Sequence, residues 1–209
     1  MDDAARVQSF LRIVPYTVHI GGRPLAMGGV GGVCTWADQQ GRGQASALMR
    51  RSLEVMRARG QSVSMLYPFS VRYYRKFGWE TVGERITYTD QPTSNLPEYE
   101  EAAQVRRAQW PDDLPAFAAA YRAGFERFNC LCERSPERWK AIFRELEEKR
   151  GQAYLIEREG RPAGYFLCEN HPLPEGGYES RTRDYIVSDP AACRAMLGFI
   201  ARLPPLVKR

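Results

Sequence analysis

Apolar and polar residues roughly alternate along Arg6–Ile20, which is rich in β-branched and aromatic side chains, and this period of two predicts a strand. Gly21–Gly22 is a dipeptide typical of a hairpin turn, and we predict a second strand after it at Pro24–Thr35. Across Gln44–Arg59 the apolar residues instead recur at helical spacing, and Gly60 follows as a typical helix stop. The chain is therefore predicted to open with a hairpin and an amphipathic helix.

Shorter elements follow this helix. Ser62–Tyr67 is a short apolar run that predicts a strand, and Pro68–Phe77 predicts a loop or a short helix. Trp79–Thr89 alternates again and predicts another strand. Gln91–Glu101 is polar, contains prolines and has no apolar period, so we predict a linker there.

Beyond the linker, the pattern predicts a second run of strands and helices. Val105–Ala108 predicts a strand and Trp110–Phe128 a helix. Ser135–Pro136–Glu137 has the order typical of a helix N-terminus and predicts a helix to about Arg150. The remaining predicted elements are a hairpin of Ala153–Glu157 with Pro162–Glu169, a strand at Arg181–Val187 and a helix at Pro190–Arg202.

The two halves share a plan of strand, short loop and amphipathic helix. The segment VGGVCTWADQQGRGQASALM in the first half corresponds to RDYIVSDPAACRAMLGFI in the second. The first loop contains Gly41 and Gly43, whereas the second, Ser188–Ala192, contains no glycine. We therefore expect two halves of similar topology, with a loop suited to a ligand only in the first.

Composition narrows the class of protein. The 209 residues are 44% hydrophobic, which is ordinary for a globular protein, and the longest apolar runs fall well short of the ~18 residues of a membrane span. The N-terminus shows no apolar core of a secretory signal, so the cytoplasm is the expected compartment. Five scattered cysteines and two histidines in unrelated contexts predict neither a disulfide framework nor a metal site.

The charge is basic and depends almost entirely on arginine. The net charge is +5, with 26 arginines and 4 lysines. Arginine suits phosphate groups, which leaves a phosphorylated cofactor or a nucleic acid open. The arginines are spread along the chain among 25 acidic residues, and no nucleic-acid-binding motif is evident. We therefore expect no nucleic acid partner and no membrane partner.

Chemistry concentrates in the loop Gln40–Ala45, between a predicted strand and a predicted helix. Free N–H groups at a helix N-terminus bind anions, and small residues let a diphosphate approach the backbone. The spacing matches neither the P-loop nor the dinucleotide-binding glycine motif. A plain polar loop with a glycine turn is the alternative. The glycines at positions 28, 29, 31 and 32 inside the preceding strand also indicate close approach of another backbone or of a ligand.

Two motifs together resemble the GNAT acetyltransferase superfamily. Gln40, Gly43 and Ala45 match its Q/R-x-x-G-x-G/A loop, and Tyr74–Trp79 matches Y-x-x-F-G-[YW] after a strand ending at Leu66–Pro68. The longer arrangement resembles the enhanced intracellular survival family of N-acetyltransferases. The resemblance implies an α/β (α+β) fold with a GNAT-type mixed twisted sheet flanked by helices, followed by a second, degenerate GNAT-like domain. It implies an acetyl-CoA-binding domain at 1–90, a linker at 91–103 and the second domain at 104–209.

The same resemblance implies roles for individual residues. The strand residues Val33, Cys34 and Thr35 would bind the pantetheine arm of acetyl-CoA, which acts as co-substrate without a metal. Tyr74 matches the family's general acid, with Tyr73 as its rival and simple packing as the alternative. Trp36 could cover the cofactor, although packing in the core is the stronger expectation. The pyrophosphate would lie on Gln40, Gly41, Arg42, Gly43, Gln44 and Ala45.

The implied function is acetyl transfer to a primary amine, on an aminoglycoside-like small molecule or a protein lysine. Compared with that family, the chain departs by lacking the first GNAT elements and the C-terminal sterol-carrier-like domain. A fragment, a wrongly started reading frame and a reduced relative are all compatible with this. The alternative function is a non-catalytic acyl-CoA-binding or assembly module, and a homo-oligomer is left open.

Overall fold

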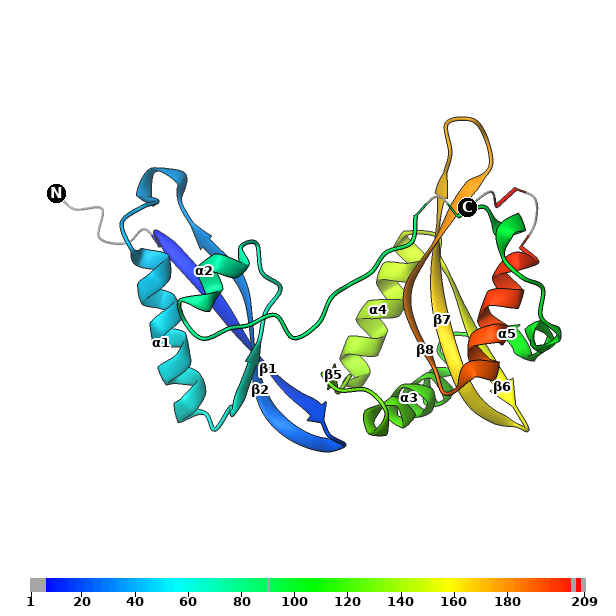
Figure 1. Cartoon of the computed structure of the whole chain (residues 1–209), viewed down its shortest axis with the longest axis horizontal. Helices are drawn as coiled ribbons and strands as arrows, with labels where there is room; N and C mark the ends of the chain where they lie inside the picture. Colours follow the sequence, from blue (N-terminus) through cyan, green and yellow to red (C-terminus); the bar gives the residue numbers. More distant parts are fainter. Residues whose placement is uncertain (1–6, 90, 204–205, 208–209) are drawn as a thin grey trace. The chain divides into compact units, whose positions relative to one another are not determined.

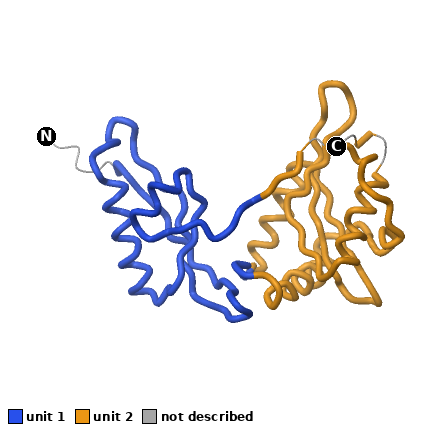
Figure 2. The backbone as a smooth tube through the Cα atoms, viewed as in Figure 1, with its two compact units in different colours: residues 1–85, 129–133 blue, residues 86–128, 134–209 orange. Residues whose placement is uncertain are grey.

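The computed structural model describes residues 7–89, 91–203 and 206–207. It comprises two compact units (Figures 1 and 2). The first unit is Met1–Arg85 with Asn129–Glu133, and the second is Ile86–Phe128 with Arg134–Arg209. The chain thus returns to the first unit for a few residues in the middle of the second.

The first unit is built on a long antiparallel hairpin, as the alternating pattern predicts. Strand β1 (Ser9–Ile20) pairs with β2 (Arg23–Thr35) along almost its whole length. The turn between them places Gly21 and Gly22 at φ of 59° and 73°, a conformation that glycine adopts without steric cost. On the other side of β2, the short strand β3 (Val63–Met65) runs parallel to it.

A two-residue strand from the middle of the chain completes this sheet, whose order is β3-β2-β1-β5. Strand β5 (Leu131–Cys132) pairs antiparallel with the end of β1. Asn129 fastens it to the hairpin turn, since its Oδ1 accepts the Gly21 N–H at 2.7 Å. His19 Nε2 and Glu133 Oε1 add a contact of 2.9 Å.

Helix α1 (Gln44–Ala58) and the short helix α2 (Val71–Arg75) contribute to one apolar core with the hairpin. Met49 and Met56 of α1 pack there with Val30 of β2 and Tyr74 of α2. The absence of a side chain at Gly28 permits this contact, because a Cβ there would lie 2.7 Å from Cγ of Met56. Helix and sheet therefore approach more closely than a larger residue would allow.

The strand predicted at Trp79–Thr89 does not form. Trp79 turns back toward β3, where its Nε1 donates to Ser64 Oγ at 3.3 Å. The residues after it run without strand pairing, and Val82, Ile86 and Tyr88 are 80%, 71% and 81% exposed. Alternation alone does not make a strand, because the backbone also needs a neighbouring edge to pair with.

The second unit has a sheet of order β4-β6-β7-β8 with helices on both faces (Figure 1). Tyr165 and Phe166 are neighbours on β7 and so point to opposite faces. Tyr165 contacts Phe117 of α3 and Trp139 of α4, whereas Phe166 contacts Phe199 of α5. The elements are β4 (Val105–Arg107), α3 (Leu114–Ala123), α4 (Pro136–Glu148), β6 (Gln152–Arg158), β7 (Arg161–Pro172), β8 (Tyr178–Val187) and α5 (Pro190–Ala201).

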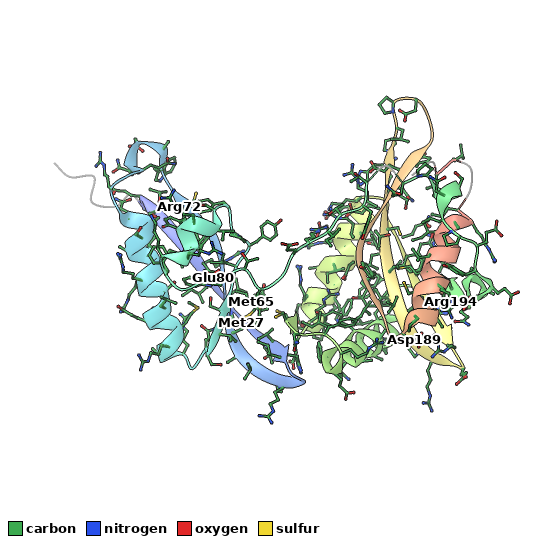
Figure 3. The ribbon with its side chains drawn as sticks, in the orientation of Figure 1. Met27, Met65, Arg72, Glu80, Asp189 and Arg194 are labelled. Carbon is green, nitrogen blue, oxygen red and sulfur yellow. The ribbon has the colours of Figure 1, made fainter. Side chains whose placement is uncertain are left out.

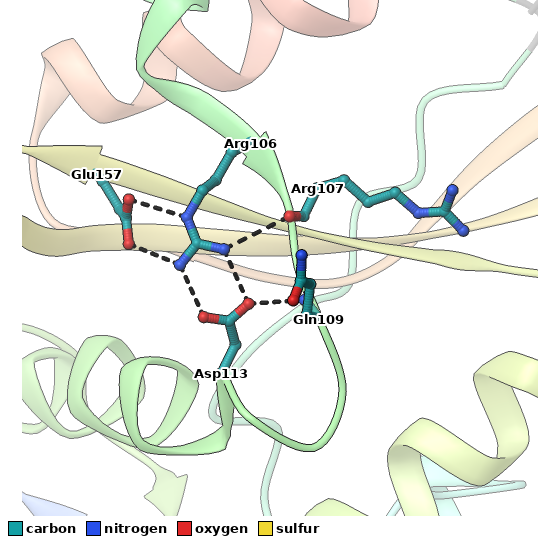
Figure 4. Close-up of polar contacts among 5 residues, drawn as sticks. All are labelled: Arg106, Arg107, Gln109, Asp113 and Glu157. Carbon is teal, nitrogen blue, oxygen red and sulfur yellow. Dashed lines mark hydrogen bonds and ion pairs between the residues drawn. The ribbon is translucent and has the colours of Figure 1, made fainter.

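Local polar contacts define the ends of these elements. Ser135 caps α4 as predicted, since its side chain accepts the Arg138 N–H at 3.2 Å. At the start of α3, the guanidinium of Arg106 lies between the carboxylates of Asp113 and Glu157 and bonds both (Figure 4). This arrangement joins β4 and β6 to the N-terminus of α3. The predicted helix Trp110–Phe128 is shorter in the structure, where α3 spans Leu114–Ala123. The structure also contains short 3-10 turns, at Ala37–Gln39, Thr93–Asn95, Glu100–Gln104 and Gly124–Glu126.

Candidate functional site

The first unit contains a point where two parallel strands separate. Pairing of β2 with β3 ends at Gly29 and Met65, whereas β2 continues to Thr35. The Trp36 N–H donates to Gln8 O of the β1 side at 3.0 Å. Because backbone groups alternate in direction along a strand, Thr35 and Val33 direct theirs to the opposite edge, which β3 has left. This edge offers donors and acceptors to an extended ligand.

The loop after β2 leads into the N-terminus of α1. Gly41 and Gly43 have φ of 78° and 79°, the left-handed region that favours glycine. Gly43 is the residue at the cap position, and among the described residues no side chain caps the first N–H groups of the helix there. A Cβ built on either glycine would meet nothing within 4 Å. The first turn of α1 therefore presents free backbone donors to an open space, which suits an anion.

The side chains around this loop are polar and carry little negative charge. Gln40, Arg42 and Gly43 are exposed, while Gln44 donates from Nε2 to Gln8 Oε1 at 2.6 Å. The first turn of α1 contains no acidic residue. Asp38 lies in the preceding turn and accepts a bond from Gln39. Arg42 is thus placed next to the free N–H groups, so that cation and helix dipole favour the same anionic ligand.

Two expectations about neighbouring residues need correction. Trp36 does not pack in the core, because its side chain is 66% exposed and donates from Nε1 to Val7 O. The strand glycines do not all indicate a ligand either. A Cβ on Gly28 would meet Met56, and one on Gly29 would meet the Tyr16 ring, so these two serve the packing of side chains.

Helix α2 places Tyr74 inside the core of the first unit. Ser70 caps this helix, and Tyr74 is only 4% exposed, packed with Met49 and Met56. Val33 packs against the same cluster, so Tyr74 and Val33 contribute to one apolar core beside β2. Burial, and secondarily the neighbouring Tyr73, raises the pKa of Tyr74 above its usual value. The phenol is therefore protonated at neutral pH.

Tyr73 occupies a different environment from Tyr74. Its ring lies 5.5 Å from Phe69 and 5.4 Å from Phe77, and 5.2 Å from Tyr74. Its hydroxyl is buried with no hydrogen-bond partner among the described residues. The two tyrosines are thus adjacent phenols in one aromatic cluster, and their burial differs.

Comparison with known families identifies the type of domain in each half of the chain. Residues 1–82 and residues 130–209 each match an Acetyltransferase (GNAT) domain family. The chain belongs to the GNAT acetyltransferase superfamily. Both halves carry the signature, which agrees with the α+β sheets of the two units and with the internal repeat in the sequence.

Solved GNAT structures share the fold of the whole chain. A GCN5-related N-acetyltransferase from Anabaena variabilis has a TM-score of 0.80 and 24% identity, and the match covers 95% of this chain and 50% of the Anabaena chain. One from Kribbella flavida has a TM-score of 0.73 and 25% identity, covering 98% and 49%. Eis1 from Mycobacterium abscessus has a TM-score of 0.66 and 18% identity, covering 97% and 53%. The chain thus spans about half the length of these structures, and no curated protein matches its sequence.

The second GNAT unit closes the position that is open in the first. Helix α5 follows β8 as α1 follows β2, but its N-cap is Asp189 (Figure 3). The Asp189 Oδ1 accepts the Ala192 N–H at 2.9 Å, and Arg158 pairs with the carboxylate at 2.7 Å. The backbone N–H of Ala192 is the first cause that lowers the pKa of Asp189, which is therefore charged at neutral pH. The carboxylate already accepts one N–H of this helix terminus and would repel a phosphate.

The sequence pattern did not suggest the capping role of Asp189. Asp189 lies in a loop whose lack of glycine was the only signal, and its pairing with Arg158 depends on a residue 31 positions away. No group of three or more His, Cys, Asp or Glu side chains within the described part of the chain could hold a metal ion. The described helices also include none that is long and apolar enough to cross a membrane.

Proposed function

We propose that this chain carries out acetyl-CoA-dependent acetyl transfer to a primary amine, by direct attack and without an acyl-enzyme. The observation that supports this most strongly is the uncapped N-terminus of α1 beside the separated strands β2 and β3. A diphosphate and an extended arm are the two parts of acetyl-CoA that such a terminus and such an edge would bind. The superfamily membership supports acyl-CoA chemistry in general.

Each part of acetyl-CoA has residues suited to it. The backbone groups of Val33 and Thr35, with Cys34 between them, would bind the amide groups of the pantetheine arm. The free N–H groups at the start of α1 would bind the diphosphate, and Arg42 would add a charge-assisted bond. The residues proposed for the diphosphate are Gln40, Gly41, Arg42, Gly43, Gln44 and Ala45.

Tyr74 is the proposed general acid. When the amine nitrogen bonds to the carbonyl carbon, the carbon–sulfur bond breaks, and the leaving thiolate takes the phenolic proton. The proton that the nitrogen loses passes to solvent, from which the phenol is protonated again. The raised pKa of Tyr74 keeps this proton in place until it is needed. The apolar surroundings that raise the pKa of a phenol also raise that of a thiol, so donor and acceptor remain matched.

The proposal is tested by replacing each of the two tyrosines separately with phenylalanine in the intact chain. Tyr74→Phe keeps the ring in the core but removes the proton, so turnover of an accepted amine should fall by roughly 10²–10⁴-fold while acetyl-CoA binding survives. Tyr73→Phe is the matched control and should cost far less. Acetylation of a panel of aminoglycosides and lysine peptides is measured by mass spectrometry. Unchanged turnover in Tyr74→Phe contradicts the role of general acid.

A binding module is the second candidate, and the burial of Tyr74 supports it. At 4% exposure this residue is a full member of the core, as a packing role requires. Such a module would bind acyl-CoA without acetylating any amine in the panel. The catalytic proposal requires acetyl-CoA and an amine acceptor as partners, whereas the binding module requires an acyl-CoA and a second protein chain. The cytoplasm is the compartment that we propose for both.

A further inference from the structure

The second unit contains a cavity that the proposed acetyl transfer does not use. Its volume is about 540 Å³, and it lies at the C-terminal end of α5, on the face of the sheet that α5 covers. The rings of Tyr154, Phe166 and Phe199 line it, and the thiol of Cys168 contributes to its wall. Small-molecule sites commonly have volumes of about 300–1,000 Å³ and mostly apolar walls. The cavity therefore has the size and lining of a ligand site.

The end of the chain forms part of this cavity. Leu203 and Val207 line it. Val207 bridges to Tyr178 at the start of β8, and the Tyr178 N–H donates to Leu206 O at 2.7 Å. Thr93 donates from Oγ1 to Val207 O at 3.2 Å. Backbone and side-chain bonds thus hold Leu206 and Val207 against the second unit, beside the cavity.

The polar groups of the cavity favour one charge. Among the described residues no carboxylate lines it, and burial raises the pKa of the Cys168 thiol, which is therefore neutral. Gln152, Asn170 and Ser180 supply uncharged hydrogen-bonding groups. Arg202 is the charged side chain among the described residues of this lining; it is exposed, and its Nη2 donates to the backbone O of Tyr99 at 3.0 Å.

The C-terminus of α5 opposes the positive charge of Arg202, but its own charge is smaller. The C-terminus of α5 carries a partial negative charge equivalent to about half an elementary charge, against the full charge of Arg202. The guanidinium of Arg107 also acts on Tyr154 from the neighbouring strand, where it opposes the effect of burial. The charged side chains at the described lining and beside Tyr154 are therefore cationic, which disfavours a cationic ligand.

We propose that this cavity binds a small organic acid with an apolar body, whose carboxylate bonds to Arg202 and whose body lies against Tyr154, Phe166 and Phe199. The planar fork of arginine matches a carboxylate with two parallel bonds. The site lies wholly within the second unit and contains no residue proposed for acetyl-CoA. It would hold its ligand whether or not the first unit transfers an acetyl group.

The test is calorimetric titration of the intact chain with phenylbutyrate and, in parallel, with phenylbutyramide. We expect saturable binding of the acid and binding about tenfold weaker for the neutral amide. Arg202→Gln should weaken the acid by about tenfold and leave the amide unchanged. Ser180→Phe, which fills the cavity from the edge strand, should abolish both.

The controls separate this site from others. Arg144→Gln removes the same charge from the exposed face of α4 and should not alter binding. Saturating acetyl-CoA should not displace phenylbutyrate, and melting temperatures confirm that the variants fold. Absence of saturable binding at millimolar phenylbutyrate, equal binding of acid and amide, or displacement by acetyl-CoA would each overturn the proposal.

Discussion

Gly43 offers the most direct test of the proposed acetyl-CoA site. Its φ of 79° lies in the left-handed region, where a residue other than glycine costs roughly 1–2 kcal/mol. Asn and Asp tolerate this region better than other residues, and a Cβ at position 43 would meet nothing within 4 Å. Gly43→Asp and Gly43→Asn should therefore both fold, with similar small losses of stability. They differ in a single charge.

That charge decides the outcome for a diphosphate ligand. Two unit charges about 4 Å apart interact by about 1 kcal/mol in water and by about 4 kcal/mol near a protein surface. Gly43→Asp should therefore weaken acetyl-CoA binding by roughly 5-fold to 900-fold relative to Gly43→Asn. In the unliganded protein the same carboxylate can bond the free N–H groups of α1, which offsets part of the backbone strain.

Thermal unfolding at increasing acetyl-CoA concentration measures the effect. At a ligand concentration of about 100 times Kd, binding stabilises the fold by about 2.7 kcal/mol, and a 100-fold weaker Kd reduces this to about 0.4 kcal/mol. Calorimetry gives the dissociation constants directly. Equal losses in the Asn and Asp variants would show that bulk, not charge, matters at position 43. Wild-type affinity in Gly43→Asp would refute the loop as the diphosphate site.

Three further predictions concern the rest of the chain. Acetyl-CoA titration should give one site per chain, because Asp189 already occupies the second helix terminus; a stoichiometry near two contradicts this. Gly28→Ala should lower the free energy of unfolding in urea by about 1–3 kcal/mol through overlap with Met56, whereas Gly31→Ala, in open space, should change it little. Pairing with Arg106 lowers the pKa of the Asp113 and Glu157 carboxylates in the folded protein. The unfolded state therefore binds more protons than the folded state, and stability falls as the pH drops below about 5. Arg106→Gln should lose less stability over that range, measured by denaturation at each pH.

The sequence determined those features that depend on a few neighbouring residues. Gly21–Gly22 marked the hairpin turn, and Ser135 marked the start of α4, because turns and caps are satisfied by bonds within about four residues. The loop before α1 was recognised in the same way, since Gly43 at a helix N-terminus leaves N–H groups free locally. The roles of individual site residues toward acetyl-CoA remain predictions.

Tertiary structure decided everything that needed a partner from elsewhere in the chain. The pattern at Trp79–Thr89 met the local requirements of a strand but found no edge to pair with, while the two residues of β5, with no comparable signal, found one beside β1. Asp189 closed the second helix terminus with the help of Arg158, and segments distant in sequence formed the cavity beside Arg202. Backbone pairing, burial and charge pairing each depend on two surfaces that meet only after folding, so a pattern along one segment specifies half of the interaction.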